Sequence, residues 1–86
     1  MKAYEYYGFI MEKEQSYKDA VQNYEVAWKL CNKNNPVVGF KLAFNYMKAK
    51  RHVNAIDVSK EILMKFPEYP KVRKDIMDKC KQFLKS

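Results

Sequence analysis

The sequence predicts an all-α fold made of two helical hairpins and a terminal covering helix. Only two glycines and three prolines occur among 86 residues, which leaves little material for β-turns. Apolar residues recur at intervals of three and four along five segments, which is the period of one helix face. The order of large and small residues largely repeats 35 positions on, and the match pairs Tyr7, Gly8, Met11 and Ala20 with Leu42, Ala43, Tyr46 and Ala55.

The first predicted hairpin comprises a helix up to about residue 13 and a second helix from about residue 17. Gln15 and Ser16 interrupt the apolar pattern. Ser16 is a favourable N-cap residue, and Asp19 adds a negative charge to the first turn. The segment "NKNN" ends the second helix. The two apolar stripes consist of Tyr4, Tyr7, Gly8 and Met11, and then of Tyr17, Ala20, Val21, Tyr24, Ala27, Trp28 and Cys31.

The second predicted hairpin begins at Asn35 and Pro36, an N-cap residue followed by a proline whose missing N–H costs nothing at the first helical position. The segment "KAKRH" separates its two helices, and Pro67 ends the second of them. The third apolar stripe consists of Phe40, Ala43, Phe44 and Met47. The fourth consists of Val53, Ile56, Ser59, Leu63 and Phe66.

A fifth helix is predicted after the turn "PEYP". It has one apolar side, and charged residues occupy the rest of its surface. A single apolar stripe is typical of a terminal helix that covers the end of a helical stack. The stripe consists of Val72, Ile76, Cys80, Phe83 and Leu84.

The alternation of large and small residues predicts how the helices pack. Antiparallel helices approach closely only where side chains are small, so we expect Gly8 to face Ala20 and Ala43 to face Ala55. Large aromatic residues at packing positions should fill the remaining space in the core. These are Tyr4, Tyr7, Tyr24, Trp28 and Tyr46.

This pattern resembles the tetratricopeptide repeat, a unit of 34 residues that forms one helical hairpin. The first copy matches it at Tyr4, Tyr7, Gly8, Met11, Ala20, Tyr24 and Ala27, and the second at Leu42, Ala43, Tyr46, Ala55 and Pro67. The departures are Asn32, Gly39, Ser59 and Ile62. The resemblance implies a right-handed superhelical stack in a single module, with repeats at residues 1–34 and 36–69 and a capping helix at residues 70–86.

Longer strings such as "GFIMEKEQ" and "GFKLAFNY" resemble a narrower family. They are similar to the C-terminal end of the long tetratricopeptide-repeat subunits of intraflagellar transport complex A. That resemblance implies a protein–protein interaction scaffold of retrograde ciliary transport, not an enzyme. It implies other subunits of that complex as partners, and a location in the cytoplasm and in the cilium or flagellum and its base.

The sequence offers no constellation for catalysis or for a cofactor. Gly8 and Gly39 are isolated, whereas phosphate-binding loops need clustered glycines. A zinc site needs about four closely spaced ligands, and the chain has one histidine and two cysteines. We therefore expect no metal and no cofactor, and we interpret Cys31 and Cys80 as buried reduced thiols. No apolar run reaches the roughly 18 residues of a membrane span.

In the tetratricopeptide-repeat family, fixed positions of the first helix of each hairpin face the concave surface that receives partners. Here those positions include Phe9, Phe40, Phe44 and Met47, which are apolar. Such a surface would suit another helix or an apolar segment. The alternative is burial of these side chains against the fifth helix or a neighbouring copy, and the sequence leaves both interpretations open.

The net charge of +7 belongs to the C-terminal half, because residues 1–35 hold five basic and five acidic groups. The basic candidates for partner binding are Lys48, Arg51, Lys71, Arg73 and Lys74. They are interpreted as solvated surface or as contacts to an acidic protein partner. The alternative function is a stand-alone module that binds a polyanion, either nucleic acid or an anionic surface. Nucleic acid is disfavoured because no RNA-binding signature or arginine-rich helix is present.

We also expect possible self-association, since no helix precedes Tyr4 to cover the first hairpin.

Overall fold

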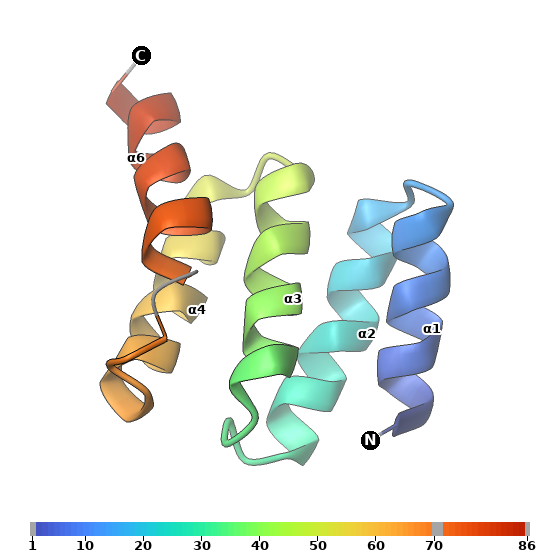
Figure 1. Cartoon of the computed structure of the whole chain (residues 1–86). Coiled ribbons are helices and arrows are strands. Elements are labelled where there is room, and N and C mark those ends of the chain that lie inside the picture. Colours follow the sequence, from blue (N-terminus) through green and yellow to red (C-terminus); the bar gives the residue numbers. More distant parts are fainter. Residues whose placement is uncertain (1, 70–71, 86) are drawn as a thin grey trace.

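The computed structural model describes residues 2–69 and 72–85, and all the regular elements within them are helices (Figure 1). The all-α prediction is therefore confirmed. Residues 70, 71 and 86, which belong to the predicted capping segment, lie outside the described part. The elements are α1 (Lys2–Lys13), α2 (Tyr17–Leu30), α3 (Pro36–Lys48), α4 (His52–Lys65), η1 (Arg73–Met77) and α6 (Asp78–Lys85).

The helix ends follow the local chemistry of the sequence. Asn35 caps α3 as predicted, because its Oδ1 accepts a hydrogen bond from the Val37 N–H at 3.1 Å. Ser16 occupies the N-cap position of α2, but its hydroxyl donates to Asp19 Oδ2 at 2.8 Å and makes no cap bond to the backbone. Lys50, with φ of 64°, lies in the turn between α3 and α4.

The fifth helix differs from the regular α-helix expected over residues 70–86. Its first turns form the π-helix η1, and α6 continues directly from it at Asp78. A π-turn widens the helix and shifts the direction of the side chains that follow. Ile76 and Met77 are buried within it.

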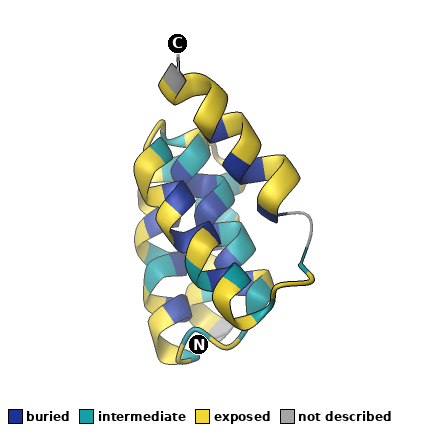
Figure 2. Ribbon diagram, turned by 90° about the vertical axis from the view of Figure 1, so that its left-hand side faces the viewer, coloured by how far each residue is buried: buried dark blue, intermediate teal, exposed yellow. Residues whose placement is uncertain are grey.

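Consecutive helices lie side by side and run in alternating directions, so the molecule is a short stack of hairpins (Figure 1). The segment formed by η1 and α6 packs mainly on α4, and η1 also reaches α3. Figure 2 shows this segment lying across one end of the stack. Its Ile76, Met77 and Cys80 are buried, as is Val72 just before it. The predicted covering helix is therefore confirmed.

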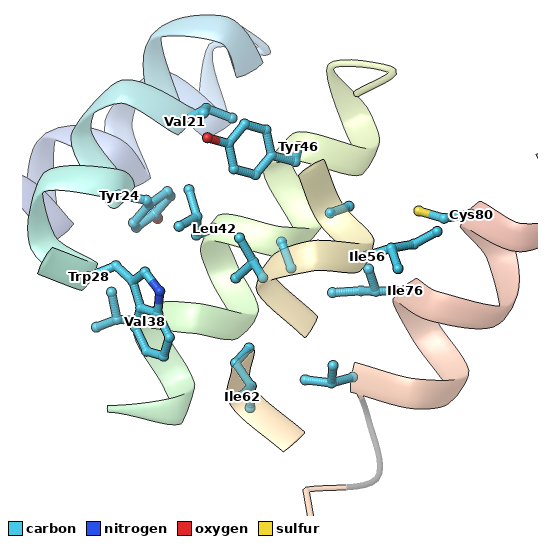
Figure 3. Packing of buried hydrophobic residues seen from close by; sticks show 14 of the residues in the cluster. Val21, Tyr24, Trp28, Val38, Leu42, Tyr46, Ile56, Ile62, Ile76 and Cys80 are labelled. Atoms are coloured by element: carbon cyan, nitrogen blue, oxygen red, sulfur yellow. The ribbon is translucent and has the colours of Figure 1, made fainter. Parts of the chain in front are cut away.

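One hydrophobic core runs through α2, α3, α4 and the fifth helix (Figure 3). Tyr24, Leu42 and Ile62 are fully buried, and Trp28 and Tyr46 are nearly so. Burial of each large side chain contributes about 1.5–3 kcal/mol to stability. The prediction that Tyr24, Trp28 and Tyr46 fill the space between the helices is confirmed.

Each of the two glycines leaves room for the aromatic ring of a neighbouring residue. A Cβ atom at Gly39 would lie 2.8 Å from side-chain atoms of both Ile62 and Trp28. At Gly8, a Cβ atom would lie 3.0 Å from the ring of Tyr24. Gly39 stands where the repeat pattern has a large residue, and the indole of Trp28 reaches the space that such a residue would take.

Three expectations about burial need correction. Tyr4 and Tyr7 were predicted to lie in the core, but they are 40% and 54% exposed. No other described helix covers the outer side of α1, which leaves these rings without a cover. Cys80 is fully buried, as predicted, and burial raises the pKa of its thiol. Cys31 is only partly buried, and its thiol donates to the Trp28 carbonyl at 3.2 Å.

Candidate functional site: an aromatic groove between the first helices of the hairpins

The first helix of each hairpin contributes aromatic side chains to one groove. Phe9 comes from α1, whereas Phe40 and Phe44 come from successive turns of α3. Together they line a hollow of about 420 Å³. We call this hollow the aromatic groove. Its lining consists of Phe9, Glu12, Val37, Phe40, Lys41, Phe44 and Tyr69.

The rings of the groove are arranged against one another. Phe40 and Phe44 stack with their centroids 6.4 Å apart and an angle of 19° between ring planes. Tyr69 meets Phe40 edge-on at 6.2 Å. Such pairs hold aromatic side chains in defined orientations. The groove is consequently preformed before any partner arrives.

Basic side chains border the aromatic groove. The Lys13 ammonium lies 5.2 Å from the centroid of the Phe9 ring, and the Lys48 ammonium lies 5.4 Å from that of Phe44. Both distances are within the range of a cation–π contact. Lys41 is part of the lining itself. The groove therefore combines an apolar floor with a positively charged margin.

Glu12, the acidic residue that lines the groove, is engaged in holding the helices together. Its Oε1 accepts hydrogen bonds from Asn45 Nδ2 at 3.0 Å and from the Tyr24 hydroxyl at 3.4 Å. Asn45, which is fully buried, also donates to the Lys41 carbonyl at 2.7 Å. Burial and then Glu12 raise the pKa of Tyr24. Glu12 thus ties α1 to α2 and α3.

A second polar tie joins the two hairpins on another side. The Tyr46 hydroxyl donates to Glu25 Oε2 at 2.7 Å. This hydrogen bond lowers the pKa of Glu25, which burial opposes. Burial and then Glu25 raise the pKa of Tyr46 to about 12. Both ties fix the angle between the hairpins and hence the shape of the groove.

Of the predicted contact residues, Phe9, Phe40 and Phe44 line the aromatic groove, and Lys48 lies at its margin over Phe44. Met47 lines a separate hollow with Lys48 beside α6. Arg51 lines a third hollow with Glu25 and Tyr46. The remaining basic candidates are Arg73 and Lys74, which are exposed on η1 away from these lining sets, and Lys71, which lies outside the described residues.

Tyr69 belongs to the groove although the sequence did not single it out. It lies in the turn between α4 and η1, so no helical periodicity marks it. An aromatic residue between the two prolines of "PEYP" is the signal that was available. Its position depends on where the turn folds back over α3, and only tertiary structure decides that.

No group of three or more histidine, cysteine, aspartate or glutamate side chains among the described residues is placed to hold a metal ion. Within the same residues, no helix has the length and hydropathy to cross a bilayer. The described surface offers an apolar groove and basic margins, which are features for binding another molecule.

Comparison with known proteins identifies the family. A family model described as the C-terminal ARM domain of tetratricopeptide repeat protein 21 matches residues 1–81. This chain belongs to that family. It is 63% identical over 84 residues to tetratricopeptide repeat protein 21B of Mus musculus and 57% identical over 84 residues to tetratricopeptide repeat protein 21A of Homo sapiens. The homolog in Caenorhabditis elegans is 44% identical over 86 residues.

These tetratricopeptide repeat protein 21 relatives are far longer than the region of similarity. The matches cover 98–100% of this chain but 6% of each relative. The resemblance to a tetratricopeptide-repeat family is therefore confirmed at the level of the family. The chain is a helical-repeat module equivalent to the C-terminal domain of those proteins.

Proposed function

We propose that this chain is a non-enzymatic protein-interaction scaffold in intraflagellar transport complex A, and that the aromatic groove binds an apolar segment of a partner subunit. The observation that carries the proposal is the preformed groove of about 420 Å³. Rigid aromatic residues at the centre of a surface contribute most of the binding energy in protein interfaces. Phe9, at 45% exposed, is the most accessible phenylalanine of the groove.

The margin of the groove favours a particular kind of segment. Lys13, Lys41 and Lys48 surround the apolar floor, and Glu12 is already engaged by Asn45 and Tyr24. An amphipathic helix with an apolar stripe and acidic flanks would complement this arrangement. On this proposal the chain acts in the cytoplasm and in the cilium or flagellum and its base, and it contributes to retrograde transport.

The test is co-purification with recombinant subunits of intraflagellar transport complex A, comparing Phe9→Glu with Met64→Glu. Both substitutions add one negative charge to an exposed helical position, and Met64 is 85% exposed on α4, outside the lining of the groove. We expect Phe9→Glu to lose at least one subunit that the wild type retains, and Met64→Glu to retain it. Circular dichroism should show both variants folded. Full retention by Phe9→Glu would contradict the proposal.

A further inference from the structure

A second hollow lies where the turn between α3 and α4 meets α6. It encloses about 310 Å³. We call it the lysine hollow, and the side chains that matter for its chemistry are Met47, Lys48, Lys50, His52, Lys79 and Phe83. They come from the end of α3, the following turn, the start of α4 and successive turns of α6. Segments far apart in the sequence thus converge on it.

The charges of the lysine hollow have one sign. Lys48, Lys50 and Lys79 contribute to its lining, and none of the described residues that line it is acidic. Neither ion pair found among the described residues involves these three lysines. Clustered ammonium groups repel one another unless an anion lies between them, so the hollow favours a negatively charged ligand.

One wall of the lysine hollow is a stacked pair of rings. His52 and Phe83 have centroids 4.5 Å apart and ring planes 12° from parallel. Phe83 is nevertheless 64% exposed, so most of its ring surface remains open. Nδ1 of His52 is buried and has no hydrogen-bond partner within the described residues, which is rare in folded proteins. The wall thus offers an apolar contact beside the three ammonium groups.

We infer that the lysine hollow binds an acidic protein segment in which carboxylates flank one apolar side chain. The carboxylates would lie between the ammonium groups, and the apolar side chain would contact Phe83 and Met47. The inference deepens the proposed function and rests on it. Lys48 connects the two surfaces, because its ammonium lies over Phe44 of the aromatic groove and its side chain also lines the lysine hollow. One partner can therefore occupy both.

The probe is a fluorescein-labelled peptide with four glutamates around one leucine, measured by fluorescence anisotropy. Lys50→Gln/Lys79→Gln removes two charges from the lysine hollow. Lys60→Gln/Lys81→Gln removes the same number from exposed positions outside it. We expect the first pair to weaken binding about tenfold and the second to change it by no more than about twofold. A peptide with glutamines in place of the glutamates should not bind.

Histidine resonances give an independent readout, because His52 is the only histidine of the chain. We expect the glutamate peptide to shift the His52 ring signals in the NMR spectrum of the wild type and of the Lys60/Lys81 control variant. Equal weakening by both double variants would overturn the inference, since it would mean attraction by net charge alone. An oligothymidylate that binds as tightly and shifts the same signals would also overturn it, in favour of a general polyanion site. These outcomes are separate from the Phe9→Glu result, which tests the aromatic groove without this probe.

Discussion

The outer faces of α1 and α4, the first and last helices of the two hairpins, differ in what covers them. On α4, Ile56 and Ser59 are buried, and Figure 3 shows Ile76 and Cys80 of the fifth helix beside Ile56. On α1, Tyr4 and Tyr7 also belong to an apolar stripe but stay exposed. A repeat hairpin buries its outer face only against a neighbouring helix, so apolar stripes on these two helices can have opposite environments.

This comparison separates the stability of the stack from its capacity to bind. The covered end, at α4, contributes fully buried side chains to the core. The open end, at α1, carries exposed tyrosines that no other described helix covers. Substitutions at the covered end should therefore change folding, and those at the open end should change association. The predictions that follow test this division, starting with the largest effect.

Ile76→Ala should produce the largest loss of stability. Ile76 is fully buried between the fifth helix and the core, and truncation would remove apolar contacts and leave a cavity. We expect the free energy of unfolding to fall by about 3 kcal/mol. Urea denaturation followed by circular dichroism measures this change. Leu84→Ala, at an exposed position on α6, should change it by less than about 0.5 kcal/mol, and equal effects would mean that the fifth helix does not close the core.

Gly39→Ala should destabilise the junction of α2, α3 and α4. The added Cβ would lie 2.8 Å from Ile62 and from Trp28, so at least one of these side chains must move. Overpacking of this kind costs about 1–3 kcal/mol, and the higher helix propensity of alanine offsets at most about 1 kcal/mol. We expect a net loss of about 1–2 kcal/mol by thermal or urea unfolding.

Gly8→Ala is the matched substitution in the first hairpin. Its Cβ would lie 3.0 Å from the Tyr24 ring, slightly further than the contacts at Gly39. The loss of stability should be smaller at Gly8, because only the Tyr24 ring has to move and its required displacement is smaller. A larger loss at Gly8 than at Gly39 would contradict the assignment of Gly39 to the tightest junction.

Tyr46→Phe should cost about 1 kcal/mol at pH 7, since it removes a hydrogen bond to a partly exposed carboxylate. Because the pKa of Glu25 is lowered in the folded state, its contribution is present above the ordinary pKa of 4.5 and is lost as pH falls through the folded value. The difference between wild type and variant should therefore shrink in acid.

The hydrogen bond between Tyr46 and Glu25 also predicts a loss of stability at alkaline pH. The pKa of Tyr46 is raised from 10.0 to about 12, so its contribution is fully present below pH 10 and is lost as pH rises towards about 12. Urea unfolding midpoints of the wild type and of Tyr46→Phe, measured from acid to alkaline pH, test both losses of stability. A difference that stays constant with pH would exclude the Tyr46–Glu25 bond as its source.

Tyr4→Ser/Tyr7→Ser should have the smallest effect on folding, within about 0.5 kcal/mol, because both rings are exposed. If the chain self-associates through the open face of α1, the double variant should sediment as a monomer at concentrations where the wild type does not. Sedimentation velocity over a range of concentrations measures this. Identical concentration dependence in both proteins would place self-association elsewhere.

Much of the aromatic groove followed from the sequence. Helical periodicity placed Phe9 on α1 and both Phe40 and Phe44 on one side of α3, and the repeat pattern indicated a shared concave surface. Met47 was assigned to the same set, but it lies beside α6 in the lysine hollow. Tyr69 was not predicted, since a turn residue has no period that reveals its direction.

The sequence by itself determined the helices, their order and most of the core, because periodicity, proline and capping residues act over a few neighbouring positions. Asn35 and Pro36, for example, specify the start of α3 through local capping and backbone geometry. Only the tertiary structure decided which apolar stripes are buried and which charges gather. Burial depends on whether another helix arrives, as at Ile76 but not at Tyr7. The lysine hollow depends on α6 crossing the turn that carries Lys50, a contact between positions about 30 residues apart.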